Sequence, residues 1–154
     1  MTTLRNEITI AAPQSAVWQA LTRLDALGQY DPGVKAATLV GVTASGPSAQ
    51  RRCELRPAGW FIEQVAVWEP EKALGFELVT CSLPVASLRH DYTLSHAAGA
   101  TRVNQVMTYQ LKYGQLGRAL DMVAMRRKWD RGIKAFLAGL KGHVEAGHVT
   151  ASPI

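Results

Sequence analysis

The sequence predicts an α+β fold in which a curved antiparallel sheet of six to seven strands wraps around one long C-terminal helix. Six strand-like segments, separated by short turns, follow one another between residues 34 and 113. One amphipathic segment, residues 115–144, then supplies the longest predicted helix. An antiparallel sheet with one wet face must bury the other, so we expect the sheet to curl round that helix.

Length and composition indicate one globular domain spanning residues 1–154. Of the 154 residues, 47% are hydrophobic and 19% are charged, which excludes collagen-like, coiled-coil and disordered classes. The longest uncharged runs, residues 8–22 and 36–50, fall short of the roughly 18 apolar residues of a membrane-spanning helix. The N-terminal residues lack the apolar core of a signal peptide. We therefore expect a cytoplasmic protein, monomeric or dimeric.

The N-terminal part is predicted to form a strand and two short helices. Residues 4–11 alternate between apolar and polar side chains, as strands do. Pro13 is a favoured first residue of a helix, and Val17 and Leu21 give that helix an apolar side. A second short helical piece ends at the turn sequence of residues 30–33, Tyr-Asp-Pro-Gly.

The following segments are predicted to form a meander of antiparallel strands. These segments are residues 34–42, 50–56, 60–68, 73–81, 85–95 and 101–113. Short connections between consecutive strands require antiparallel pairing. The connection at residues 97–100 also sets a register, which pairs Tyr92 with Gln105 and His90 with Met107.

The C-terminal helix is predicted to carry an apolar stripe. At about 100° per residue, one arc of about 80° holds Met122, Met125, Trp129, Ile133, Phe136 and Leu140. Leu116, Leu120 and Val123 lie off this stripe, so we expect the first turns to kink or splay.

The net charge of +5 is concentrated on the same helix. Residues 114–142 contain seven Lys or Arg and two Asp, so the rest of the chain is neutral. Such a pattern is usually a solvated helix face. Weak contact with an anionic membrane or an acidic partner is the alternative, and we expect no nucleic acid as a partner.

No motif indicates a metal or a cofactor. Cys53 and Cys81 are too few for a disulfide framework and are expected to be free thiols. The four histidines lack metal-ligand spacing; they are His90, His96, His143 and His148. Walker, GxGxxG, GxSxG and HExxH sequences are absent, so we expect neither a metal nor a cofactor.

Strand alternation predicts which side chains face the helix. In the last two strands the inward set is Leu88, His90, Tyr92, Leu94, Val103, Gln105, Met107, Tyr109 and Leu111. In the hairpin around Pro70 the inward set is Phe61, Glu63, Val65, Val67, Leu74, Phe76 and Leu78. This choice leaves Gln64 and Glu77 in water, and it puts Trp60 and Trp68 on the outer face or at a strand end.

A few inward polar groups in an apolar wall are typical of a small-molecule pocket. The polar candidates are Glu63, His90, Tyr92, Gln105 and Tyr109. The predicted ligand contacts are His90, Tyr92, Gln105, Met107, Tyr109, Phe76, Met122, Met125, Trp129 and Ile133. Hydrogen-bonded core residues are the plainer interpretation of an inward His or Tyr. If the protein is an enzyme, the acid–base group is His90 with Glu63 or Tyr92.

Several short segments resemble a known superfamily in their order along the chain. They are Ile8-Thr9-Ile10-Ala11-Ala12-Pro13, Val17-Trp18, Tyr30-Asp31-Pro32-Gly33-Val34, Trp68-Glu69-Pro70 and the terminal Leu140-Lys141-Gly142-His143-Val144-Glu145. Over residues 4–146 the chain resembles the SRPBCC superfamily, which includes START-domain proteins and pollen-allergen-like carriers. Its polyketide cyclase/dehydrase and lipid-transport group is the nearest branch. The resemblance implies a helix-grip fold with a cavity for a sterol, lipid, quinone, plant hormone or polyketide, and it transfers no catalytic motif.

Three functions follow as hypotheses. The first is a carrier or sensor of a hydrophobic small molecule such as a lipid, a quinone or a polyketide-like compound. The second is a polyketide cyclase or dehydratase that uses the same cavity. The third is a partner- or membrane-associated module that uses the basic helix. Binding is favoured over catalysis, because no recognisable nucleophile, metal set or pair of carboxylates is present.

Overall fold

The structure, a computed structural model, describes the backbone of residues 1–151 and the side chains of residues 1–122 and 124–147. The strands are β1 (Thr2–Ile10), β2 (Val34–Val40), β3 (Gln50–Leu55), β4 (Trp60–Glu69), β5 (Ala73–Cys81), β6 (Val85–Ala97) and β7 (Ala100–Leu111). The helices are α1 (Gln14–Thr22), the 3₁₀ helix η1 (Leu24–Gln29), α2 (Gly114–Leu120), the π-helical turn η2 (Asp121–Met125) and α3 (Arg126–Ala151). The side chains of Val123 and His148 lie outside the described residues.

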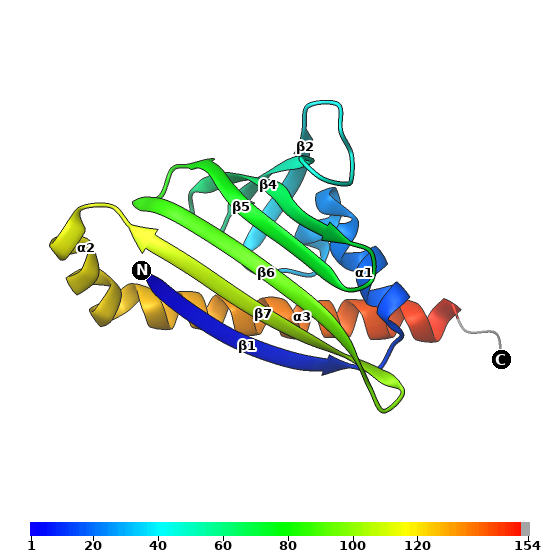
Figure 1. Cartoon of the computed structure of the whole chain (residues 1–154). Coiled ribbons are helices and arrows are strands. Elements are labelled where there is room, and N and C mark those ends of the chain that lie inside the picture. Colours follow the sequence, from blue (N-terminus) through cyan, green and yellow to red (C-terminus); the bar gives the residue numbers. More distant parts are fainter. Residues whose placement is uncertain (152–154) are drawn as a thin grey trace.

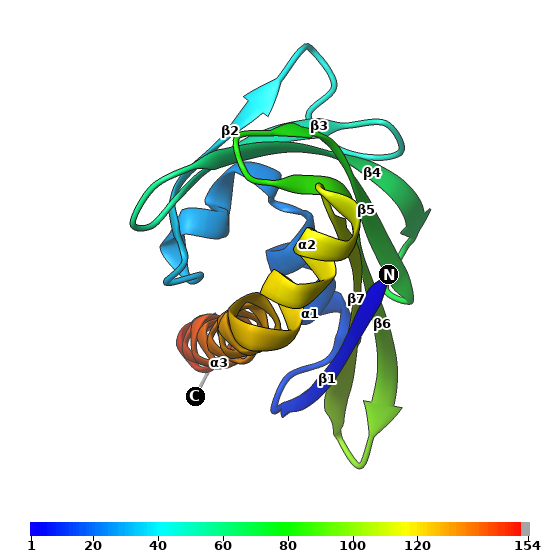
Figure 2. The ribbon, with the colours of Figure 1, turned by 90° about the vertical axis from the view of Figure 1, so that its left-hand side faces the viewer.

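All the strands form one antiparallel sheet in the order β1-β7-β6-β5-β4-β3-β2. Figure 2 shows the sheet curving around the axis of α2 and α3, with α1 and η1 filling the far side of the concave face. The predicted α+β helix-grip fold is therefore confirmed, including the seven strands and the two short helices. None of the helices in the described part of the chain is long and apolar enough to cross a membrane.

The register predicted for the last hairpin is confirmed. Tyr92 lies opposite Gln105 and His90 lies opposite Met107. The turn is tighter than the expected four-residue connection, because Ala98 and the following glycine both have positive φ, 46° and 84°. Such a two-residue turn matches the twist of the flanking strands and locks their pairing.

One predicted strand face is wrong near the end of β4. The pairing shifts between Val65 and Val67, which is the mark of a β-bulge. Beyond the bulge Val67 lies opposite Gly75 on the outer face, whereas Trp68 lies opposite the buried Leu74. Trp68 therefore turns inward, where its ring meets that of Trp18 edge-on at 5.1 Å.

The C-terminal helix is continuous in space but not in its hydrogen bonding. The π-helical turn η2 separates α2 from α3, which confirms the expected irregularity in its first turns. Farther along, Gly139 passes the carbonyl of Tyr30 so closely that any Cβ would clash with it. Because of this approach, Phe136 and Leu140 reach the segment after η1 and join the core.

Candidate ligand-binding site

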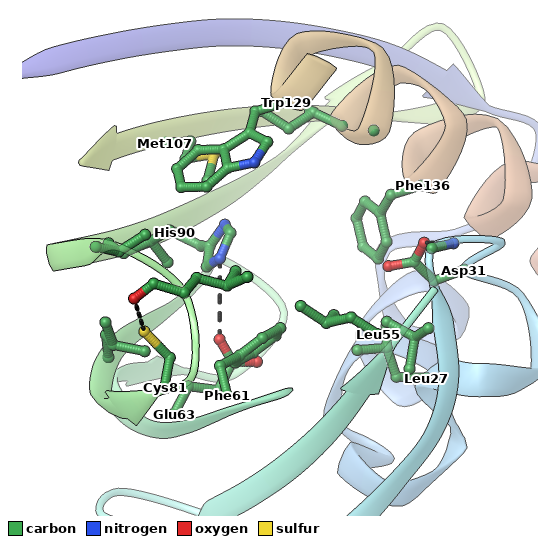
Figure 3. Close-up of a pocket in the computed structure, with 18 of the residues that line it drawn as sticks. Leu27, Asp31, Leu55, Phe61, Glu63, Cys81, His90, Met107, Trp129 and Phe136 are labelled. Atoms are coloured by element: carbon green, nitrogen blue, oxygen red, sulfur yellow. Dashed lines mark hydrogen bonds and ion pairs between the residues drawn. The ribbon is translucent and has the colours of Figure 1, made fainter. Parts of the chain in front are cut away.

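A cavity of about 290 Å³ lies between the concave face of the sheet and α3. Figure 3 shows Trp129 and Phe136 of α3 facing Phe61, Leu55 and the strand residues across it. Much of the wall is apolar, and these side chains are Leu27, Val34, Leu55, Phe61, Leu78, Leu83, Val85, Leu88, Met107, Met125, Ile133 and Phe136.

The cavity opens toward the end of the molecule that carries α2. Among the residues that line it, Arg56, Pro57 and Ala58 in the β3–β4 turn are exposed, as are Lys128 and Gly132 on α3. These two segments therefore form the rim. In Figure 1, α2 and the turn between β5 and β6 lie at this same end.

A buried ion pair forms one corner of the cavity. The guanidinium of Arg51 donates from Nε to Oε1 of Glu63 at 2.6 Å, and the two side chains are 6% and 2% exposed. Arg51 Nη1 also donates to the carbonyl of Leu24 at 3.3 Å. The guanidinium lies 4.4 Å from the centre of the Phe76 ring. Arg51 is therefore fixed on three sides, and it holds one oxygen of Glu63.

His90 completes the corner from the neighbouring strands. Its Nδ1 lies 3.3 Å from Nε2 of Gln105, and its Nε2 lies 3.9 Å from Oε2 of Glu63 (Figure 3). Burial lowers the pKa of His90 from its ordinary value, although Glu63 opposes that shift. The imidazole is therefore neutral at pH 7. The Gln105 amide is oriented with its nitrogen toward the ring, and in this orientation Nδ1 of His90 accepts and Nε2 carries the proton.

Two buried oxygens at this corner have no hydrogen-bond partner within the described part of the chain. They are Oε2 of Glu63 and Oε1 of Gln105. Glu63 is 2% exposed and Gln105 is 1% exposed. Buried polar atoms are nearly always hydrogen-bonded, so two such orphans beside a cavity need an explanation.

Most of the predicted ligand contacts line the cavity. Those that line it are His90, Tyr92, Gln105, Met107, Met125, Trp129 and Ile133. Glu63, the remaining acid–base candidate, lines it as well. Glu63, His90 and Tyr92 therefore line the same cavity, on the strand face that the alternation of side chains predicted.

Three predicted contacts lie elsewhere. Phe76 points inward but is covered by the guanidinium of Arg51. Tyr109 turns toward the first turn of η2, where its hydroxyl donates to Asp121. Met122 is 83% exposed, because the wider π turn changes the angle between successive side chains and takes this residue off the stripe.

Arg51, the residue that holds Glu63, is not among the site residues predicted from the sequence. The signal was present in the alternation of β3, where Arg51 shares a strand face with Cys53 and Leu55. The buried Cys53 and the cavity-lining Leu55 mark this face as inward. An arginine on an apolar strand face predicts a buried carboxylate partner.

The thiols and the possible metal ligands are scattered. Cys53 and Cys81 are both free, the first buried and the second half-buried at the cavity wall. Within the described residues no three His, Cys, Asp or Glu side chains form a group that could hold a metal.

Comparison with known proteins assigns the fold to a family. The family model described as "Polyketide cyclase / dehydrase and lipid transport" matches residues 1–145. A comparison of the sequence with curated proteins finds no match.

Solved structures share the whole fold at low sequence identity. TTHA0849 from Thermus thermophilus has a TM-score of 0.81 at 20% identity, with 95% of this chain and 99% of that chain covered. The Zhui aromatase/cyclase from Streptomyces sp. R1128 has a TM-score of 0.79 at 13% identity, with 94% of this chain and 93% of that chain covered. A START superfamily protein from Mycobacterium smegmatis has a TM-score of 0.75 at 14% identity, with 94% of this chain and 97% of that chain covered. At such identities the likeness establishes a common fold.

Proposed function

The chain belongs to the polyketide cyclase/dehydrase and lipid transport family of the SRPBCC superfamily, and we propose that it binds an apolar small molecule between the sheet and α3, as a carrier or a sensor. The observation that carries the proposal is the cavity of about 290 Å³ with an apolar wall and one polar corner. Ligand pockets usually combine such a wall with a few groups that fix orientation.

The size of the cavity narrows the class of ligand. An apolar cavity of about 150 Å³ holds benzene, so one of about 290 Å³ has room for roughly two fused rings. This volume favours a compact ring system or a short chain over a two-chain lipid.

Binding is favoured over acid–base chemistry by the state of His90. Its Nδ1 accepts from Gln105 and its Nε2 carries a proton, so the neutral ring has no free lone pair with which to abstract a proton. Glu63 is held by Arg51. A cyclase or dehydratase in this cavity would need His90 to change tautomer during the reaction.

The test is a matched pair of substitutions on β7. Met107→Trp fills the cavity wall, whereas Thr108→Trp adds the same side chain on the opposite face of the same strand. An environment-sensitive apolar dye is expected to bind the wild type and Thr108→Trp alike, and to bind Met107→Trp at least about 10-fold more weakly. Equal binding to all three folded proteins, checked by circular dichroism, would overturn the proposal.

A second candidate function has its own observation, at the end of the molecule that carries α2. Four large apolar side chains in and just before α2 and η2 are exposed to solvent: Tyr113, Leu116, Leu120 and Met122. Exposed basic side chains lie in the same stretch of the chain: Arg118, Arg126, Arg127 and Lys128. Exposed apolar groups beside Lys and Arg suit the surface of an anionic bilayer. We propose that this end docks on such a surface, next to the mouth of the cavity.

Vesicle sedimentation tests this docking. Binding is expected with phosphatidylcholine vesicles that contain phosphatidylglycerol, and it should weaken with salt and without the anionic lipid. Leu116→Glu combined with Met122→Glu should abolish it. Val42→Glu changes an even more exposed apolar residue in the β2–β3 loop, away from α2 (Figure 1), and should leave binding intact. Equal loss in both variants would contradict docking through α2.

A further inference from the structure

The polar corner of the cavity offers one donor and one acceptor that face each other without meeting. Nε2 of His90 and Oε2 of Glu63 are 3.9 Å apart, which is too long for a direct hydrogen bond. Nε2 carries a proton, because Nδ1 is occupied by Gln105. Oε2 is a buried carboxylate oxygen with no partner in the described part of the chain. A single atom that both accepts and donates would satisfy the two groups.

The charges at the corner are already balanced. The guanidinium of Arg51 and the carboxylate of Glu63 form a pair at 2.6 Å, and both are almost fully buried. A ligand carboxylate would add a second negative charge beside Glu63, and a ligand ammonium could not accept from Nε2 of His90. A buried charge without a partner is strongly disfavoured, so the group that enters this corner is neutral.

We infer that the ligand carries a hydroxyl group, which accepts a hydrogen bond from His90 Nε2 and donates one to Glu63 Oε2. A ketone or ether oxygen only accepts, and a hydrocarbon does neither. Gln105 holds the imidazole in the required tautomer and Arg51 holds the carboxylate, so these two are positioning residues. The inference rests on the proposed cavity binding and adds the chemical class of the ligand, a neutral alcohol or phenol with an apolar body.

Three probes of nearly one shape test the inference by calorimetry at pH 7. They are 2-naphthol, 2-methylnaphthalene, in which a methyl replaces the hydroxyl, and 2-naphthoate, which carries a carboxylate. Hydrogen bonds that involve a charged group correspond to about 10- to 100-fold in affinity. We expect 2-naphthol to bind that much more tightly than 2-methylnaphthalene, and 2-naphthoate to bind most weakly.

Two substitutions assign the preference to the corner. Glu63→Gln removes the charged acceptor, and His90→Phe keeps a ring but removes Nε2. Glu63→Gln is expected to bring the ratio of the 2-naphthol and 2-methylnaphthalene affinities below about 3-fold, since the charge-assisted hydrogen bond is lost. His90→Phe removes a neutral donor and should lower the same ratio by about 2- to 10-fold. If Glu63→Gln fails to fold because Arg51 is left unpaired, His90→Phe still decides. Thr108→Trp, on the outer face, is the control and should keep the wild-type ratio.

The outcomes separate this inference from the proposed function. Equal binding of 2-naphthol and 2-methylnaphthalene, with both lost in Met107→Trp, would overturn hydroxyl recognition and leave the cavity proposal standing. A ratio of the 2-naphthol and 2-methylnaphthalene affinities that is unchanged in folded His90→Phe would also overturn it, as would tighter binding of 2-naphthoate. Failure of all three probes to bind would overturn both.

Discussion

Asp121 and Glu63 are both buried carboxylates, and they are partnered differently. Asp121, at the start of η2, accepts from Thr2 Oγ1 at 2.5 Å with one oxygen and from the Tyr109 hydroxyl with the other. Glu63 is paired through only one oxygen, with Arg51, and its second oxygen faces the cavity without a partner in the described part of the chain.

The difference separates a structural carboxylate from a candidate functional one. Asp121 ties β1, β7 and η2 together, and both of its oxygens are used in doing so. Glu63 is also held in place, by Arg51, but its Oε2 atom has no hydrogen-bond partner in the described part of the chain. Burial is similar for both, at 8% and 2% exposed, so the number of unsatisfied oxygens distinguishes them, not the degree of burial.

The largest expected effect comes from removing the partner of Glu63. Arg51→Met should lower the free energy of unfolding by about 3–5 kcal/mol, because an unpaired carboxylate is left buried. Urea denaturation measures this loss. The double variant Arg51→Met/Glu63→Leu should recover most of it, since a buried ion pair and a packed apolar pair are often equally stable. A single variant as stable as the wild type would mean that water reaches Glu63.

A smaller loss is expected at the other carboxylate, with no effect on the cavity. Asp121→Ala removes the acceptor of two hydroxyl groups and should lower the free energy of unfolding by about 1–3 kcal/mol. Binding of 2-naphthol should stay within about 2-fold of the wild type, because Tyr109 and Asp121 do not line the cavity. A large change in affinity would contradict the division between the two carboxylates.

The pH dependence of stability gives a third test, through His90. Burial lowers the pKa of His90 in the folded protein, so the unfolded chain takes up this proton first as pH falls. The neutral histidine thus adds stability above about pH 6.5, and that stability is lost below it, by at most about 1.4 kcal/mol per pH unit. Urea unfolding between pH 8 and pH 5 should show a steeper loss for the wild type than for His90→Phe. Parallel curves would mean that the ring is solvated.

The smallest effect concerns access to the cavity wall. Burial raises the pKa of Cys53 to about 12, and this residue is fully buried. Cys81 is half-buried beside the cavity. In the folded protein a thiol reagent should modify Cys81 first and Cys53 only on unfolding. Bound 2-naphthol should slow the first reaction. An unchanged rate of Cys81 modification at saturating 2-naphthol would place the probe outside the cavity.

The sequence by itself determined the strands, the antiparallel meander of β2 to β7 and much of the inward face. Alternation assigned Glu63, His90 and Gln105 to the concave side, and the short turn at residues 97–100 fixed how the last two strands pair. These properties are local, because period-two patterns and turn residues act over a few positions.

The tertiary structure decided what the local patterns could not. The bulge that turns Trp68 inward depends on how β4 meets β5. Met122 is exposed within the π turn, whose first residue, Asp121, is hydrogen-bonded to β1 and β7. The polar corner forms where β3, β4, β6 and β7 bring distant side chains together. Which oxygen of Glu63 is left unpaired is decided by the positions of Arg51 and His90 in space, and no single segment of sequence contains that geometry.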